Sequence, residues 1–235
     1  MYNENDYSFP DSRSRAAVGA HLANVYWWMT LALLISGVAA WGVGTSPELA
    51  KVLIKNPGLC FILILAEFGL VLGISLAINK MSAATATALF IAYSLLNGIT
   101  LSFIFLAYTQ GTIVSAFAVT AGTFTVMALV GTVTKMDLSG FGTFFLMLLF
   151  GLIIASLVNI FWVNDTLAQI INYVGVLIFT GLTAYDAQKV KEMYLAQADD
   201  HPETLRKLAV LGALTLYLDF VNLFLFILRI FGRRD

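Results

Sequence analysis

Charged residues are scarce in this chain. They make up 11% of its 235 residues, whereas about 25% is usual in soluble domains. Hydrophobic residues account for 60% of the sequence, so a soluble fold of this size would lack the polar side chains needed to cover its surface. The formal net charge of −1 gives no sign of nucleic-acid binding. The composition therefore predicts a membrane protein whose main partner is the lipid bilayer.

Cysteine is almost absent as well, and no enzyme motif stands out. The single Cys60 excludes an intramolecular disulfide and any metal site built from several cysteines. The sequence has no phosphate-binding loop, no histidine-rich zinc motif and no Ser/His/Asp signature. The first residues are polar, which argues against a cleavable signal peptide. We therefore expect no enzyme and no resident cofactor, and we expect residues 1–20 to form a polar tail.

What the sequence does contain is a series of long uncharged stretches. A helix needs about 20 apolar residues to cross the hydrocarbon core of a bilayer. Lys80 and Lys135, for example, are separated by 54 uncharged positions, enough for two helices and a turn. The stretches show no period-two alternation, which favours helices over a barrel. We predict an all-α membrane domain over residues 21–235, with spans at about 22–43, 58–79, 83–108, 113–134, 141–162, 167–188 and 208–230, and one strongly polar loop at 189–207.

Lysine and arginine counts predict the orientation of these spans, because cytoplasmic segments are enriched in both residues. With seven crossings and the N-terminus inside, eight basic residues lie inside and five outside. If the last span turned back, so that Arg229, Arg233 and Arg234 returned to the inside, the count would be eleven to two. The sequence therefore predicts a cytoplasmic N-terminus and leaves the seventh crossing open.

Three acidic residues, Glu67, Asp186 and Asp219, fall inside predicted spans. A carboxylate in hydrocarbon costs several kcal/mol unless it is paired, hydrated or protonated, so such residues are functional candidates by default. The structural alternative is a protonated acid that bonds to a neighbouring helix. Asn222 lies three residues after Asp219 and shares its helix face. Intramembrane amides such as Asn97 are expected to bridge helices rather than to line a pore.

Asp186 and Asp219 lie on consecutive antiparallel spans. At 1.5 Å per residue, both are expected roughly 5–15 Å below the same membrane surface. Two carboxylates in hydrogen-bonding reach cannot both ionise cheaply, so the pair would share a proton and titrate as a unit. A rise in pH would remove that proton and create repulsion, which is a physical route to a pH-sensitive gate. The pair could equally attract Ca²⁺, but two carboxylates are too few for a tight site, so binding would be weak and transient.

Two segments carry a resemblance to a known family. Gly181-Leu-Thr-Ala-Tyr-Asp-Ala-Gln-Lys189 and Leu216-Tyr-Leu-Asp-Phe-Val-Asn-Leu-Phe-Leu225 resemble the best-marked motifs of the Bax-inhibitor family, also called the transmembrane BAX-inhibitor-motif family, in its bacterial branch. The likeness extends over almost the whole chain. It implies a seven-helix bundle in which the last helix is surrounded by the other six. It also implies that Asp186 and Asp219 form the pH sensor of a calcium leak, and Glu67 matches an acidic residue of helix 2.

One departure from the family pattern concerns the basic residue beside the aspartates. The family's bacterial calcium-leak member has an arginine in helix 2 that latches the pair. Here the second span has no arginine, and Lys80 at its end is the nearest basic residue. A lysine cannot offer the planar bidentate fork of an arginine. The resemblance therefore leaves the latch, and the pH range of gating, open.

Three functions compete on these observations. The first is a pH-sensitive cation leak, for Ca²⁺ above all, in the bacterial inner membrane. The second is a membrane interaction protein that modulates a stress response or a membrane quality-control protease, with the N-terminal tail and the 189–207 loop as contacts. The third is an intramembrane aspartyl protease, which would need a Gly-x-Gly-Asp motif, but Tyr217-Leu218 precede Asp219. We predict the first function and keep the second as the alternative.

Overall fold

The computed structural model describes residues 12–197 and 201–232, and over this part of the chain all regular elements are helices. Seven of the described helical segments are long and apolar enough to cross a membrane. The predicted all-α architecture with seven spans is therefore confirmed. The spans are α1 (Ser12–Gly44), α3 (Pro57–Ala77) with η1 (Ile78–Lys80), α4 (Ala83–Leu101) with α5 (Ile104–Ala107), α6 (Gln110–Val133), α7 (Ser139–Phe161), α8 (Asp165–Ala196) and α9 (Pro202–Phe231).

Local signals in the sequence set the starts of several helices. Ser82, Thr109 and Asn164 each accept a hydrogen bond from the backbone N–H three residues on, as N-cap residues do. Pro57 and Pro202 occupy the first positions of α3 and α9, where the missing N–H of proline has no cost. The three capping side chains therefore pair backbone N–H groups that lipid would leave without a partner.

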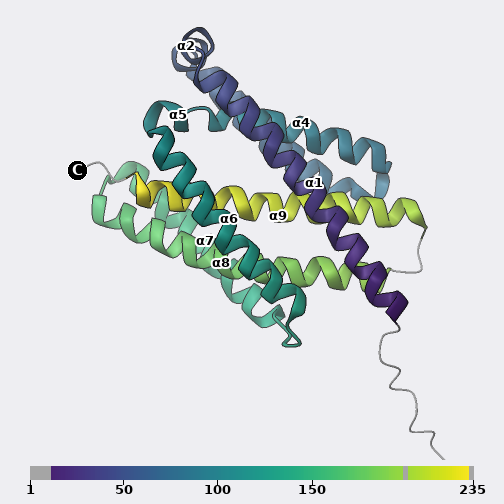
Figure 1. Cartoon of the computed structure of the whole chain (residues 1–235). Helices are drawn as coiled ribbons and strands as arrows, with labels where there is room; N and C mark the ends of the chain where they lie inside the picture. The colour runs from purple at the N-terminus through teal and green to yellow at the C-terminus, as the bar shows by residue number, and fades with distance from the viewer. Residues whose placement is uncertain (1–11, 198–200, 233–235) are drawn as a thin grey trace, which may run out of the picture.

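The last helix lies at the centre of the bundle. Of its most apolar window, 67% is buried, against 6% for α3 and for α7. In Figure 1, α9 runs through the middle of the molecule, with α1 crossing it and α4 and α8 on either side. α9 packs against α8, α1, α6 and α4, whereas α7 packs mainly against α8. The ring of helices around α9 is thus less complete than the resemblance implied.

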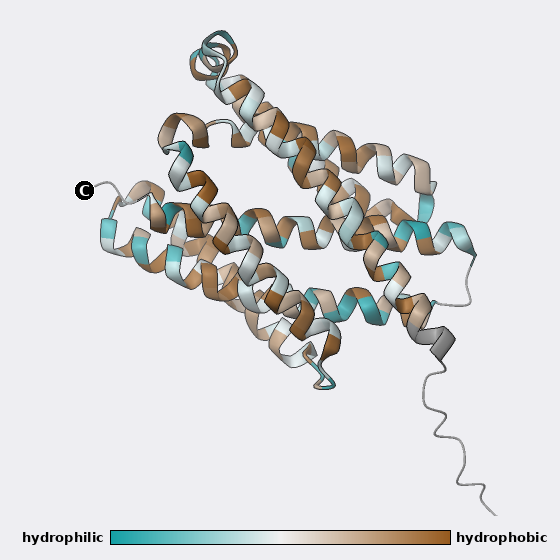
Figure 2. Ribbon diagram, in the orientation of Figure 1, coloured by the Kyte–Doolittle hydropathy of each residue, from teal (hydrophilic) through white to brown (hydrophobic). Residues whose placement is uncertain are grey.

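The outer surface is apolar. Phe61, Phe68, Phe150 and Phe161 are among many large hydrophobic side chains that point away from the protein. Figure 2 shows hydrophobic residues along most of the helices, with hydrophilic residues gathered toward helix ends and connections. Such a surface suits lipid and not water. The chain is therefore a multi-pass membrane protein.

The predicted polar loop at 189–207 is wrong in its extent. α8 continues to Ala196, and α9 begins at Pro202. Val190 and Tyr194 remain buried and extend the packed stripe of α8 beyond the predicted span. Packing therefore keeps this segment helical although its outer face is charged. Asp199 and Asp200 lie outside the described residues.

Three further boundaries differ from the prediction. The third span breaks near Ser102, between α4 and α5, and a short helix, α2 (Pro47–Lys55), follows the first span. α1 begins at Ser12, inside the predicted polar tail, and residues 1–11 lie outside the described part of the chain. α9 has 30 residues, which corresponds to roughly 45 Å and is long enough to cross a bilayer. Arg233 and Arg234 lie beyond the described residues.

Candidate functional site

The sequence-predicted aspartates meet between α8 and α9. The two helices are consecutive, run in opposite directions and pack closely along their length. Asp186 comes from the last third of α8 and Asp219 from the middle of α9, and their carboxyl groups lie close enough to interact electrostatically. Asp219 is only 4% exposed, and Asp186 is partly buried. The structure thus brings together two acids that lie 33 positions apart in the sequence.

Both carboxyl groups line a cavity of about 570 Å³ between α7, α8 and α9. Small-molecule sites in proteins typically measure about 300–1,000 Å³. Most of the wall is apolar and includes Leu152, Phe179 and Phe226. The pair is therefore in a hollow of low polarity, where charge is poorly solvated and interactions between charges are strong.

One basic residue accompanies the pair. Lys189 lies one helical turn after Asp186, lines the same cavity and interacts electrostatically with that carboxyl group. It is largely exposed, and its Nζ lies 5.7 Å from the centre of the Tyr185 ring. Asp219 Oδ2 is buried and has no hydrogen-bond partner among the described residues. The cavity therefore holds two acids, one base at its edge and one unused acceptor oxygen.

The other predicted site residues separate into two groups. Asn222 lines the cavity, and its Nδ2 donates a 2.8 Å hydrogen bond to the Leu218 carbonyl one turn earlier. Lys80 ends η1, is exposed and does not line the cavity. The basic residue beside the aspartates is Lys189, which ends the first family motif and begins the predicted polar loop. Its three-residue spacing from Asp186 was the signal that could have identified it.

Glu67 belongs to a second polar cluster, which does not share the cavity. Its Oε2 accepts a 2.9 Å hydrogen bond from Asn97 Nδ2, and its Oε1 accepts a 2.8 Å bond from the Thr100 hydroxyl. Both oxygens of Glu67 are thus in contact with polar side chains of α4. These bonds join α3 to α4, and the bridging role expected of Asn97 is confirmed.

The cluster continues to the central helix through Tyr217. Its hydroxyl donates a 2.8 Å bond to Asn97 Oδ1 and lies 2.6 Å from Ser36 Oγ on α1. Four helices therefore meet through one hydrogen-bonded chain at a fully buried tyrosine. Because Tyr217 and Asp219 are two residues apart on a helix, they point to opposite sides of α9. Neither Tyr217 nor Ser36 is charged, so the distribution of charges in the sequence does not predict their role.

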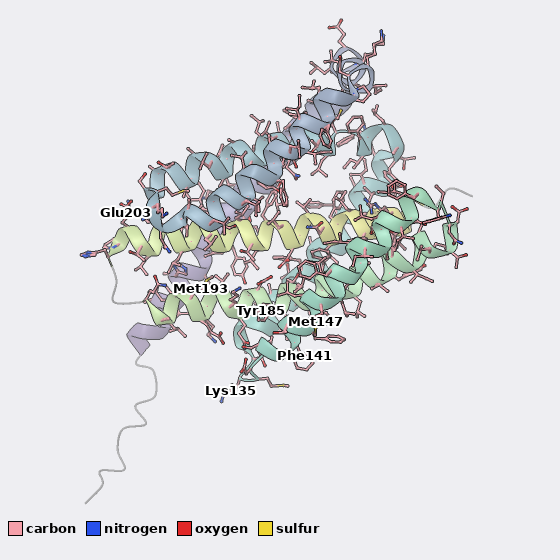
Figure 3. All side chains as sticks on the ribbon, turned by 180° about the vertical axis from the view of Figure 1, so that it is seen from behind. Lys135, Phe141, Met147, Tyr185, Met193 and Glu203 are labelled. Atoms are coloured by element: carbon pink, nitrogen blue, oxygen red, sulfur yellow. The ribbon has the colours of Figure 1, made fainter. Side chains whose placement is uncertain are left out.

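A set of polar contacts fixes the segment that follows Asp186. Gln188 Oε1 accepts a 2.8 Å bond from the Leu138 N–H, and its Nε2 donates a 2.7 Å bond to the Met136 carbonyl. Lys191 Nζ donates a 2.7 Å bond to the Thr132 carbonyl at the end of α6. Figure 3 shows this region from behind, with Lys135 in the connection from α6 to α7 and Tyr185 on α8. The connection is thus fastened to α8 within one turn of the aspartate.

The cavity offers few ligands for a metal ion. Among the described residues, no three His, Cys, Asp or Glu side chains come together. Ca²⁺ takes six to eight oxygen ligands, so the two carboxylates offer an incomplete site. What the arrangement can do is hold a proton between two oxygens, accept a cation transiently, or both.

Seven apolar spans, of which the last is central, and acidic side chains within the spans define a polytopic α-helical membrane protein. The model of the family described as inhibitor of apoptosis-promoting Bax1 matches residues 18–235, and the chain belongs to this family.

Bacterial relatives cover nearly the same length. The inner membrane protein YbhL of Escherichia coli K12 is 47% identical over 230 residues, which is 96% of this chain and 98% of that protein. A Borreliella burgdorferi protein is 47% identical over 213 residues, or 91% of each chain. A Deinococcus radiodurans protein is 39% identical over 218 residues, which is 93% of this chain and 92% of the relative. The resemblance drawn from the motifs around Asp186 and Asp219 is therefore confirmed at the level of the family.

Proposed function

We propose that this protein is a pH-sensitive cation leak, with Ca²⁺ as the main ion, and that the Asp186–Asp219 pair is its gate. The observation that supports this function is that both carboxyl groups line one largely apolar cavity between α7, α8 and α9 and interact electrostatically there. Two acids placed in this way are costly to maintain in a membrane unless they act on protons or cations. The proposal assigns no enzymatic reaction and no resident cofactor.

The gate works through one shared proton. With the proton present, one carboxyl donates to the other, and α8 and α9 stay together. Deprotonation places two like charges in contact in a poorly hydrated site, and their repulsion drives the helices apart. The titratable groups that line the cavity are Asp186, Lys189 and Tyr185 from α8 and Asp219 from α9, and α7 contributes none to this lining. Lys189 moderates the repulsion from the edge of the site. A rise in pH should therefore open the path.

We also propose that the protein lies in the bacterial inner membrane and that its N-terminus is in the cytoplasm. The name of the Escherichia coli relative, an inner membrane protein, supports the location. Basic residues support the orientation, because they gather at the face of the bundle where α1 begins and cytoplasmic faces are enriched in them. Those on described segments at this face are Lys80, Lys135, Lys189, Lys191, Arg206 and Lys207.

The test is Ca²⁺ flux into dye-loaded liposomes that contain the purified protein, measured at several values between about pH 5 and pH 8, because a coupled acid pair loses its protons in separate macroscopic steps. The native chain should conduct more as the pH rises. Asp186→Asn, Asp219→Asn and the double variant should lose that dependence. Asp165→Asn provides the matched control, because Asp165 is an exposed aspartate at the opposite end of α8.

Two results would count against the gate. Variants of the pair that conduct with the native pH dependence would remove the aspartates from the mechanism. No flux above protein-free liposomes at any pH would favour the alternative function, an interaction protein that modulates a stress response or a membrane protease. Site-specific crosslinking from the charged end of α8, around Lys189 and Glu192, would then be the way to capture such a partner.

A further inference from the structure

The cavity that holds the aspartates is open toward the lipid. Between residues 209 and 228 of α9, five residues are only partly buried, whereas the others are buried: Leu211, Thr215, Leu218, Asn222 and Leu225. Their spacing of four and three residues places them on one side of the helix. On α7, three residues that line the cavity are also strongly exposed, namely Leu146 at 43%, Ile153 at 47% and Leu157 at 52%. The gap between α7 and α9 therefore connects the cavity to the outer surface of the bundle.

The cavity is elongated along the helices. Its lining on α9 runs from Thr215 to Phe226, a rise of roughly 16 Å at 1.5 Å per residue. The lining on α7, from Leu146 to Leu157, covers the same number of residues. A volume of about 570 Å³ with this length has the form of a groove that can take one flexible chain.

Polarity is distributed unevenly along this groove. The carboxyl pair and Lys189 lie in the half nearer the start of α9, whereas Phe179, Leu157 and Phe226 lie toward the other end. Asp219 Oδ2 is an acceptor without a donor among the described residues, in a side chain that is only 4% exposed. A buried acceptor of this kind is costly to leave unpaired. The site therefore has an apolar portion and an acidic head with a place for one more donor.

We propose that this cavity binds a single-chain amphiphile with a protonated amino group, which enters from the bilayer between α7 and α9. The hydrocarbon chain lies against the apolar half of the groove. The ammonium group donates to Asp219 Oδ2 and to Asp186, because an ammonium carries donors only and the pair offers acceptors with net negative charge. The positive charge of Lys189 repels an amine at the edge of the cavity, whereas Asp219 Oδ2 lies deeper and remains accessible. Binding does not depend on ion conduction, and it stands or fails separately from the proposed leak.

The experiment is native mass spectrometry of the full-length protein in non-ionic detergent, titrated with dodecylamine, dodecanol or dodecanoic acid. These probes share one chain length and differ in the charge of the head group. Dodecylamine should bind with a stoichiometry of one and should bind about tenfold more tightly than dodecanol, which corresponds to about 1.4 kcal/mol. Dodecanoic acid should bind most weakly, because its carboxylate would meet two others.

Two variants test the two halves of the groove. Asp219→Asn keeps the shape of the side chain and should weaken dodecylamine about tenfold while leaving dodecanol unchanged. Ser156→Phe adds a ring inside the groove, since Ser156 lines it from α7, and should weaken both probes. The controls are Asp165→Asn, at the exposed start of α8, and Ile154→Phe, at a lipid-facing position two residues from Ser156.

Several outcomes would overturn the proposal. One is equal binding of dodecanol and dodecylamine, which would leave an apolar groove without selection for charge. Another is native affinity for dodecylamine in both Asp219→Asn and Ser156→Phe, or no saturable binding by the native chain. A fourth arm uses lysophosphatidylethanolamine, which carries the same ammonium on a phosphate. If lysophosphatidylethanolamine binds more tightly than dodecylamine, and if Asp219→Asn abolishes its binding, the proposal is supported and the occupant is a phospholipid head group with its chain, not a simple amine.

Discussion

Replacement of Tyr217 by phenylalanine isolates one hydroxyl at the meeting point of four helices. The ring keeps its edge-to-face contacts with Phe90 and Tyr93, so packing around α9 is preserved. What is lost is the 2.8 Å bond to Asn97 Oδ1 and the 2.6 Å contact with Ser36 Oγ. The change therefore tests the polar chain and not the core.

The expected cost follows from which groups lose their partners. Ser36 keeps the Ser94 carbonyl at 2.7 Å, so its hydroxyl remains satisfied. Asn97 Oδ1 loses its donor and is left as a partly buried acceptor, and an unpaired buried acceptor costs about 1–3 kcal/mol. Asn97 also donates a hydrogen bond to Glu67. Because linked hydrogen bonds polarise one another, loss of the bond from Tyr217 weakens the Asn97–Glu67 bond as well. We expect a loss of about 1–2 kcal/mol in the free energy of unfolding.

The assay is denaturant unfolding of the purified protein in detergent, as a double-mutant cycle of Tyr217→Phe with Asn97→Leu. Polar contacts in membrane bundles have coupling energies of about 0.6 kcal/mol on average and up to about 1.7 kcal/mol, and this pair should fall in the upper half. Tyr93→Phe is the control, since the Tyr93 hydroxyl makes no hydrogen bond within the described residues and the ring packs on Tyr217. A Tyr217→Phe variant as stable as the native chain, with no coupling to Asn97, would refute the reasoning.

Three further predictions concern the packing and the connections. Gly131→Ala should cost about 1–3 kcal/mol of unfolding free energy, because an added Cβ would collide with the α8 backbone, whereas Gly122→Ala on the same helix meets open space and should be neutral or slightly stabilising in the same melting experiment. Gln188→Ala should leave two backbone groups of the α6–α7 connection without partners, so we expect a loss of about 1–3 kcal/mol and faster hydrogen exchange there, and native exchange rates would contradict this. Hydrogen bonds from the Ser139 hydroxyl and N–H hold the pKa of Asp137 below its ordinary value, so their contribution to stability is present above the ordinary pKa and is lost as the pH falls through the lowered one. Ser139→Ala should raise that pKa in an NMR titration, and an unchanged titration would show that the hydroxyl is not the cause.

Much of the fold follows from where charges are missing. The spacing from Lys80 to Lys135 requires two helices, and the structure places α4 and α6 there. The position of Asp186 and Asp219 on consecutive antiparallel helices was also enough to bring them together, because a helix advances by a fixed rise per residue. These features depend only on length and hydropathy, which a single sequence records directly.

The parts that could not be predicted depend on packing. Val190 and Tyr194 are buried by neighbouring helices, so α8 continues through a segment that reads as polar when considered alone. Tyr217 and Ser36 lie in uncharged stretches, where hydropathy does not distinguish a lipid-facing hydroxyl from one that joins four helices. Lys80 ends η1 after α3, which packs mainly against α4, so this lysine does not line the cavity between α7, α8 and α9.

The central position of α9 has a consequence for how the protein is made. Chains are synthesised from the N-terminus, so the helix that supplies the common core is the last to emerge from the ribosome. Until it inserts, Asn97 and Ser36 lack the tyrosine between them, and α4 lacks the 3.0 Å bond from its Ala83 N–H to Glu203 at the start of α9. A chain that stops before residue 202 therefore leaves Asn97 Oδ1 and the Ala83 N–H of α4 without these partners. Completion of the final segment is the event that turns six inserted helices into one bundle.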